Sequence, residues 1–318
     1  MAIYDAYAKA QGLKAVVATE GHASVKDFKT FLGHDDAARV TEDNVRDWRN
    51  ALAAETTNRG RLRDPQTVKK RIGILSSILR WAKEERLIPN NVANSVVVRV
   101  PRKPNLRNSD FTAAEAKAIL TASLLPSATR LSEQNKLARR WIPWLCAYTG
   151  ARVGEMSQLR GQDVTQIDGI WAIRITPEAG TVKDGNARIV PIHPHLIKQG
   201  FLAIAEKDGP LFYDPARQRV QSTDNRHFKK VGERLATWVR TEVGITDRAV
   251  KPNHGWRHLF KTQAIASNML ERTSDAITGH APKSVGQTYG SVPIKAMAEA
   301  IDKMPCFAVD GTEGRQGF

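Results

Sequence analysis

A basic, proline-containing segment at residues 101–109 interrupts the apolar patterns on either side and constrains the fold most. It holds two prolines, three basic residues and no apolar periodicity, which is typical of a linker. A chain of 318 residues is long enough for two domains of ordinary size. We therefore expect one domain over residues 1–100, a linker over 101–109 and a second domain over 110–318.

The first hundred residues carry helical patterns. Apolar side chains recur at spacings of three and four along residues 67–87, and Phe28 and Leu32 share one face of an earlier helix. Thr41 is a suitable N-cap for a helix that contains Trp48. No stretch alternates as a half-buried strand does, so the sequence predicts a small helical bundle.

The second part of the chain mixes helical and strand patterns. Helical spacing recurs in the ranges 113–124, 137–149, 226–243, 254–269 and 293–304. Residues 170–175 and 187–192 have the composition of strands, and Asp184–Gly185 between them is a hairpin-turn signal. The fold class that we predict is mainly α, with a small β-sheet in the second domain.

The net charge points to a polyanionic partner. The chain has 48 lysines and arginines against 33 acidic residues, a formal charge of +15 that both expected domains share. Such an excess attracts nucleic acid, because each neutralised phosphate releases condensed counterions; an anionic membrane surface is the second candidate. No stretch approaches the ~20 consecutive apolar residues of a membrane helix, so we expect no membrane partner.

The cysteines and the start of the chain favour a reducing compartment. Cys146 and Cys306 are far apart and match neither a metal-binding spacing nor a disulfide framework. Residues 1–14 lack the basic and apolar regions of a secretory signal. We expect a cytoplasmic, nucleoid-associated protein.

Four short segments carry side chains suited to phosphate chemistry. They are Thr149–Glu155 with Arg152, Lys183 beside the expected turn, His254–Arg257, and Gly279–His280 followed by Tyr289. Each segment alone is a weak signal, because isolated Arg, Lys and His residues are usually solvated surface groups. Their value lies in the combination and in its order along the chain.

That combination resembles the tyrosine recombinase, or phage integrase, family. The family's order is an arginine, a lysine on a β-hairpin, His-x-x-Arg, a histidine or tryptophan, and a nucleophilic tyrosine. The matching residues here are Arg152, Lys183, His254, Arg257, His280 and Tyr289. Glu155 matches an acidic residue that the family often has beside its first arginine. Residues 67–91 resemble the last helices of the family's core-binding domain, although Val92 follows Asn91 where a proline is common.

The resemblance implies a fold and a partner. A helical, SAM-like core-binding domain and a mixed α/β catalytic domain with a C-terminal tail would form a C-shaped clamp on double-stranded DNA. The protein would be a site-specific DNA recombinase that acts as a homotetramer on two sites, is a monomer off DNA and can use accessory DNA-bending proteins. No cofactor is implied, and no cluster of carboxylates suggests a metal ion.

The matched residues suit transesterification at a DNA phosphodiester. Arg152 and Arg257 can stabilise charge on the non-bridging oxygens, because a guanidinium is planar and stays charged. The Tyr289 hydroxyl, whose unperturbed pKa is ~10, can attack phosphorus once it loses its proton. The expected product is a 3′-phosphotyrosine, which conserves the bond energy for religation.

Three further side chains would handle protons. We expect His254 to act as the base and His280 to donate a hydrogen bond to a phosphate oxygen. We expect Lys183 to protonate the leaving 5′-oxygen when a flexible hairpin closes on DNA.

A run of basic residues in the first domain is a candidate DNA contact. Its members are Arg59, Arg61, Arg63, Lys69, Lys70 and Arg71. Clustered charge of this kind binds phosphates and rarely specifies a sequence. The alternative is a solvated loop and helix start.

The residues after Tyr289 have a helical apolar face that contains Ile294, Met297 and Ile301. In the family this region often packs on a neighbouring protomer, so the face is a candidate docking surface. The alternative is a helix that folds onto its own domain.

Two other functions fit parts of the pattern. A type IB topoisomerase shares the phosphotyrosine chemistry, but the length and the domain order favour a recombinase. A non-catalytic DNA-binding protein on a recombinase scaffold would have lost some of the six positions, and all six are present.

Overall fold

In the computed structural model the chain forms two compact units, residues 1–104 and 105–318. The structure describes residues 1–58, 60–101, 104, 106–127, 130–180, 182, 185–217, 227–281, 284 and 289–309. Each unit has a hydrophobic core of its own.

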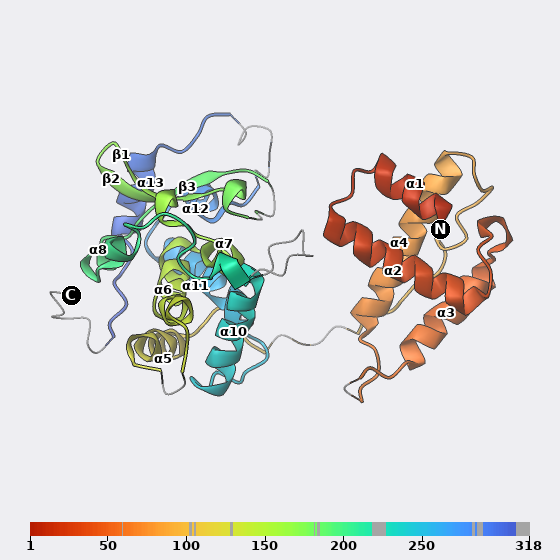
Figure 1. Ribbon diagram of the computed structural model, residues 1–318, viewed down its shortest axis with the longest axis horizontal. Coiled ribbons are helices and arrows are strands. Elements are labelled where there is room, and N and C mark those ends of the chain that lie inside the picture. The colour runs from red at the N-terminus through yellow and green to blue at the C-terminus, as the bar shows by residue number, and fades with distance from the viewer. Residues whose placement is uncertain are drawn as a thin grey trace. The chain divides into compact units, whose positions relative to one another are not determined.

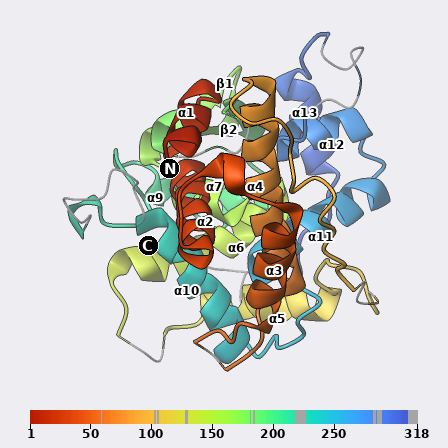
Figure 2. The same ribbon diagram turned by 90° about the vertical axis from the view of Figure 1, so that its right-hand side faces the viewer.

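The first unit is a helical bundle (Figures 1 and 2). Its described helices are α1 (Ala2–Ala10), α2 (Ala15–Leu32), α3 (Glu42–Ala54) and α4 (Pro65–Glu84), with a 3₁₀ turn at Ala37–Arg39. α4 contacts the other three helices, and Trp48 of α3 packs on Phe28 of α2 with ring centroids 4.8 Å apart. The helical prediction for this part is confirmed, although α1 was not predicted.

Local signals set where these helices begin. The Thr41 hydroxyl accepts from the Asn44 amide at 3.2 Å, and the Asn44 side chain accepts from the Thr41 amide at 2.9 Å. This reciprocal cap starts α3 as predicted. α4 starts at Pro65, whose missing N–H costs nothing in the first turn.

The second unit combines helices with one small sheet. Its described helices are α5 (Ala113–Leu124), α6 (Glu133–Thr149), α7 (Val153–Ser157), α8 (Pro194–Lys198), α9 (Phe201–Ile204), α10 (His227–Thr241), α11 (Pro252–Ala266), α12 (Glu271–Thr278) and α13 (Ile294–Asp302). Its described 3₁₀ turns are Gly161–Asp163, Pro177–Ala179 and Pro215–Arg217. The described strands are β1 (Val164–Ile167), β2 (Ile170–Ile175) and β3 (Arg188–Pro191).

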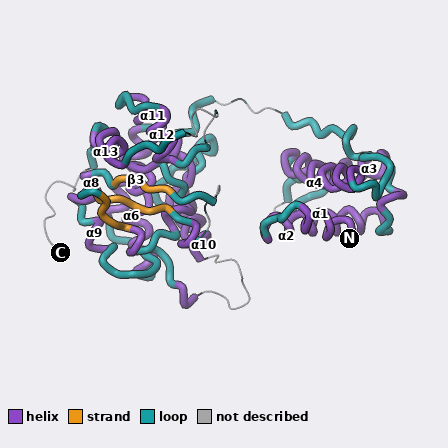
Figure 3. Tube along the Cα trace, turned by 90° about the horizontal axis from the view of Figure 1, so that it is seen from above, coloured by secondary structure: helices purple, strands orange, loops and turns teal. Residues whose placement is uncertain are grey.

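The sheet has the antiparallel order β1–β2–β3 among the described residues. Both predicted strands are confirmed, and β3 is shorter than expected. β1 was missed, although Asp168 and Gly169, with φ of 50° and 78°, form a tight turn that is itself an Asp-Gly signal. α12 and α13 both contact β3 (Figure 3).

α6 runs through the core of the second unit. Trp144, Cys146 and Tyr148 are wholly buried, and Trp141 is nearly so. A helix that is buried this fully is surrounded by other elements, and α6 contacts α5, α7, α10 and α11.

The residues after Tyr289 fold onto their own unit. α13 packs against β3, with Met297, Ile301 and Met304 buried. The Phe307 amide donates to the Tyr148 hydroxyl at 3.0 Å. The apolar face completes the local core, as the alternative of a helix folded onto its own domain predicts, and docking on a neighbouring protomer stays a prediction.

None of the described helices is long and apolar enough to cross a membrane.

Candidate active site

The turn between α6 and α7 places Arg152 at the start of a helix. α6 ends at Thr149, and the next residue, Gly150, has a left-handed φ of 58° that turns the chain. The Gly150 amide donates to the Cys146 carbonyl at 2.9 Å. A Cβ at Gly150 would lie 2.7 Å from side-chain atoms of Phe260 and Thr278, so only glycine fits. Arg152 is the N-cap of α7.

Glu155 holds both the backbone and the guanidinium of Arg152. Its carboxylate accepts from Arg152 N at 3.0 Å and from Arg152 Nη1 at 2.8 Å. The Glu155 side chain is 2% exposed and that of Arg152 is 24% exposed. Burial opposes ionisation of Glu155, but hydrogen bonds from Arg188 and Arg152 outweigh it and lower the Glu155 pKa. Glu155 is therefore a buried anion that orients Arg152.

Arg257, on α11, ties three predicted site residues together. It is buried, and its Nη1 donates to the Gly150 carbonyl at 2.9 Å and to the Thr278 carbonyl at 2.6 Å. Its Nη2 lies 3.1 Å from His280 Nε2. Because Gly150 precedes Arg152 by two positions, these bonds bring Arg152, Arg257 and His280 to one place.

His280 has a defined proton position in this arrangement. Because a guanidinium only donates, His280 Nε2 accepts from Arg257, and neutral His280 carries its proton on Nδ1. Nδ1 lies 2.8 Å from Thr278 Oγ1 and 3.3 Å from Asp275 Oδ1. Burial lowers the His280 pKa, the Arg257 and Lys261 charges lower it further, and Asp275 raises it. The sequence predicts that His280 donates a hydrogen bond to a phosphate oxygen. Donation from Nε2 requires a proton on that nitrogen, and in this arrangement neutral His280 carries its proton on Nδ1 instead.

His254 lies in the first turn of α11. The helix begins at Pro252, and Lys251 is its N-cap. Asn253 Nδ2 donates to the Gly232 carbonyl of α10 at 2.8 Å, which fixes the start of α11 against α10.

The charges around His254 favour its neutral form. Burial lowers its pKa, and the His258, Arg257 and Arg152 charges lower it further. A neutral imidazole can accept a proton, which is what a base must do.

Tyr289 stays outside the buried cluster. Its side chain is 74% exposed. Arg272 Nη2 donates to the Tyr289 carbonyl at 2.5 Å and to the Gly290 carbonyl at 2.8 Å, which anchors the backbone at this point. Tyr289 is therefore exposed, whereas Arg257 is buried.

Lys183 and Arg59 lie outside the described residues, and their roles stay predictions. The strands that flank Lys183 pair antiparallel, with Ile175 opposite Arg188. Asp184 of the expected turn is also outside the described residues.

The basic run of the first unit is partly neutralised. Its described members are Arg61, Arg63, Lys69, Lys70 and Arg71. Lys70 Nζ lies 2.5 Å from Glu20 Oε1, and Arg71 Nη1 lies 2.5 Å from Asp27 Oδ2. Acidic side chains of α2 therefore compete with any phosphate for these two cations, which the sequence alone did not indicate.

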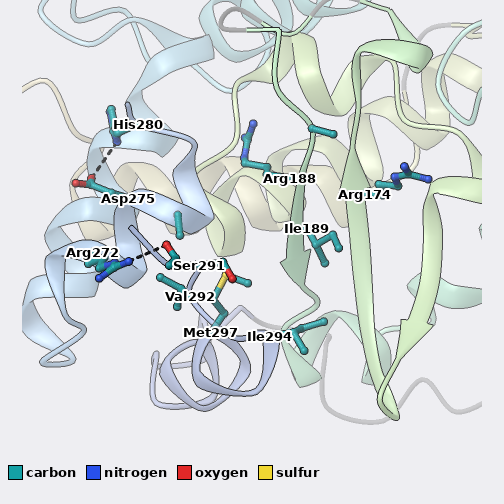
Figure 4. A pocket seen from close by; sticks show the side chains of 13 residues that line it. Arg174, Arg188, Ile189, Arg272, Asp275, His280, Ser291, Val292, Ile294 and Met297 are labelled. Atoms are coloured by element: carbon teal, nitrogen blue, oxygen red, sulfur yellow. Dashed lines mark hydrogen bonds and ion pairs between the residues drawn. The ribbon is translucent and has the colours of Figure 1, made fainter. Parts of the chain in front are cut away.

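A cavity of about 570 Å³ lies beside His280, lined by β3, α12 and the start of α13 (Figure 4). Sequence reasoning missed polar residues that line it, among them Arg188, Arg272 and Asp275. A signal existed for Arg188, because strand alternation puts it on the same face as buried Val190 and Ile192. The other two sit on a short helix that was not predicted.

Among the described residues, no group of three or more His, Cys, Asp or Glu side chains could hold a metal ion. His193 and His195 serve structural roles. The His193 ring stacks on Tyr148, and its Nδ1 accepts from the His195 amide at 3.0 Å.

No model of a protein family matches the chain. Sequence comparison finds relatives named tyrosine recombinases. The tyrosine recombinase XerC of Mesorhizobium japonicum is 26% identical over 255 residues, covering 74% of this chain and 72% of the relative. The tyrosine recombinase XerA of Pyrococcus furiosus is 24% identical over 208 residues, covering 65% of each chain.

Solved structures share the fold. A lambda integrase dimer bound to a COC′ core site matches with a TM-score of 0.61 at 18% identity, covering 92% of this chain and 98% of that one. The Tn1549 transposon integrase in complex with circular-intermediate DNA matches with a TM-score of 0.59 at 15% identity, covering 94% and 97%. These matches confirm the mainly helical fold with a small sheet.

Proposed function

This chain belongs to the tyrosine recombinase and phage integrase family, and from its site we propose that it cuts and rejoins double-stranded DNA at specific sites through a 3′-phosphotyrosine. The observation that carries the proposal is the link between the two arginines. Buried Arg257 bonds the carbonyl of Gly150, two residues before Arg152, and it also contacts His280. Two guanidinium groups held in one place form a clamp for the oxygens of one phosphate.

The proposed reaction is a pair of phosphoryl transfers. The Tyr289 oxygen attacks phosphorus as its proton passes to a base, for which His254 is the candidate. The bond from phosphorus to the 5′-oxygen breaks, and Lys183 protonates that oxygen. A 5′-hydroxyl from a second DNA site then attacks the phosphotyrosine and releases Tyr289. No net energy source is needed, because one phosphodiester replaces another.

Tyr289 has to move for this reaction. Its side chain is exposed and Arg257 is buried, so we expect DNA binding to bring the hydroxyl to the phosphate. His280 must also gain a proton on Nε2 or yield its place beside Arg257 to the phosphate. A phosphate between the two residues favours the protonated imidazole, because a nearby negative charge raises a histidine pKa.

Covalent capture tests this proposal without knowledge of the target sequence. The full chain is incubated with a pool of randomised duplexes that carry a nick, so that the short cleaved fragment diffuses away and the adduct accumulates. We expect denaturant-resistant protein–DNA adducts whose phosphopeptide contains Tyr289. Tyr289→Phe keeps the ring and should form none while still binding the duplex. Adducts on another tyrosine, such as Tyr148 or Tyr213, or no adduct above that of the Phe variant, would overturn the proposal.

Recovered target sites then separate a recombinase from the alternatives. Two copies placed on one plasmid should exchange strands, and crosslinking during the reaction should trap a tetramer. Relaxation of supercoils without exchange would instead favour the topoisomerase. Chelators should leave adduct formation intact; loss with EDTA that added metal restores would overturn the metal-free mechanism.

A further inference from the structure

Arg188 is a largely buried cation that the proposed chemistry does not use. It is the first residue of β3 (Figure 4), and its side chain is 11% exposed. Burial of an arginine is costly unless its donors are bonded, so its partners indicate what the site gains from it.

Those partners join three elements of the site. Arg188 Nη2 donates to Glu155 Oε2 at 2.6 Å, and Nη1 lies 3.3 Å from Glu155 Oε1. Arg188 Nε donates to the Ile277 carbonyl at 3.0 Å. One guanidinium therefore connects β3 to α7 and to the last turn of α12, just before His280.

The chain leaves room for this guanidinium. A Cβ at Gly279 would lie 2.9 Å from Arg188 Cζ and Nη1, so a larger residue there would push the guanidinium aside. Gly279 also has a φ of 69°, which ends α12 and turns the chain into His280. The same glycine thus serves the helix end and the arginine.

Glu155 is shared between Arg188 and Arg152. Arg152 reaches the carboxylate through Nη1 and its backbone amide. Within the described residues, these contacts leave the other edge of the Arg152 guanidinium for a phosphate oxygen. If Arg152 alone held the Glu155 carboxylate, the carboxylate and the Arg152 guanidinium could rotate together. The two Nη atoms of Arg188 bond both carboxylate oxygens and therefore fix the plane of the carboxylate.

We propose that Arg188 is a positioning residue that orients Arg152 through Glu155 and holds the end of α12 that carries His280. The inference rests on the proposed function, because its readout is adduct formation at Tyr289. If the parent chain forms no adduct, the proposed function fails; if the parent reacts and the variants below react equally, only this inference fails.

The first experiment measures the rate of adduct formation on a captured site. Arg188→Met should lower this rate roughly 10- to 100-fold, because a misplacement of about 1 Å is enough to do so. Arg188→Lys should recover part of the loss, since a lysine can bond Glu155 but cannot also span to Ile277. Arg139→Met is the matched control: Arg139 forms a two-bond pair with Glu242, at 2.7 and 2.8 Å, and is 19% exposed. The control should react at the parent rate.

The second experiment separates positioning from general loss of structure. Methylphosphonate linkages replace one non-bridging oxygen by a methyl group, and the two diastereomers remove different oxygens. The diastereomer on which Arg152→Ala loses least marks the oxygen that Arg152 serves. The defect of Arg188→Met should shrink on that diastereomer and persist on the other. Equal defects on both would show a structural role only and overturn the inference.

A third comparison tests whether Arg188 acts through Glu155; if Arg188→Met fails to fold, Arg188→Lys takes its place in both backgrounds. Arg188→Met/Glu155→Gln removes the buried charge that the single variant leaves without its partner. If Arg188 acts through Glu155, adding Arg188→Met to Glu155→Gln should cost less activity than adding it to the parent. An equal cost in both backgrounds would overturn the inference.

Discussion

Exposed ion pairs occur in both units, but among the described residues a buried arginine occurs in the second unit alone. In the first unit, lysines and arginines pair with carboxylates at the surface, as Lys70 does with Glu20 where both side chains are about half exposed. In the second unit, Arg257 is buried and bonds backbone carbonyls. Exposed pairs contribute little to stability and exchange partners readily, whereas a buried guanidinium is part of the framework. A lysine or arginine therefore carries the same formal charge in either unit, but its burial and its partners decide how available that charge is to DNA.

Deletion of the segment that contains α13 tests whether this helix is part of the hydrophobic core of the second unit. Deletion of residues 291–318 removes the buried side chains of Met297, Ile301 and Met304. At about 1.5–3 kcal/mol for each buried side chain, the loss should be roughly 5–9 kcal/mol, which approaches the whole stability of a domain. Calorimetry of the truncated chain should show the second unit's transition lost and the first unit's retained. A melt like that of the parent would instead support a tail that serves a neighbouring protomer.

Loss of the buried Arg257 guanidinium should cause the next largest decrease in the free energy of unfolding. Arg257→Met leaves the carbonyls of Gly150 and Thr278 without a donor, so it should cost about 2–5 kcal/mol in urea denaturation. Lys70→Met, which breaks one exposed pair in the first unit, should cost less than about 1 kcal/mol. Equal costs for the two variants would break the comparison between the units.

Mild acid should weaken the second unit first. Burial lowers the pKa of His193, whose Nδ1 accepts from the His195 amide. The unfolded chain then takes up a proton near its ordinary pKa of ~6.5 while the folded chain resists, so stability falls as the pH drops from about 7 to 5. The loss should be smaller in His193→Asn; equal slopes in both proteins would contradict this assignment.

The carboxylates of the first unit respond at lower pH. Hydrogen bonds from Arg46 and Arg63 lower the pKa values of Glu42 and Glu55. Their contribution is complete above the ordinary pKa of ~4.3 and is lost only as the pH falls further. Thermal melts between pH 7 and 5 should therefore shift the transition of the second unit and leave that of the first unchanged.

The smallest effect on stability should accompany a sequence-independent loss of DNA binding. Replacing Lys69, Lys70 and Arg71 by alanine should change stability by less than about 1 kcal/mol and weaken binding to all sequences alike. The salt dependence of binding should become shallower by fewer than about 3 ions, because Glu20 and Asp27 already neutralise two of the three cations. A loss confined to one DNA sequence would show base readout instead.

Much of the fold and part of the site could be predicted because the signals are local. The spacing of apolar side chains marked α3, α4, α5 and α6, and Thr41 marked the start of α3. The segment Thr149–Glu155 was singled out as a candidate site, and in the structure Arg152 stands at the start of α7. The proposed roles of the six matched residues rest on their order along the chain, and the adduct experiment is what tests them.

Tertiary structure alone decided the partners of these residues. Arg257 and Gly150 are 107 positions apart, and Arg188 and Glu155 are 33 apart, so no local pattern connects either pair. The proton position on His280 depends on Arg257, and the burial of Ile301 depends on β3 lying beneath it. Periodicity reports which face of an element is buried, because it reflects one element's own geometry. Which group meets that face, and which nitrogen carries a proton there, is decided when distant segments pack together and exclude water.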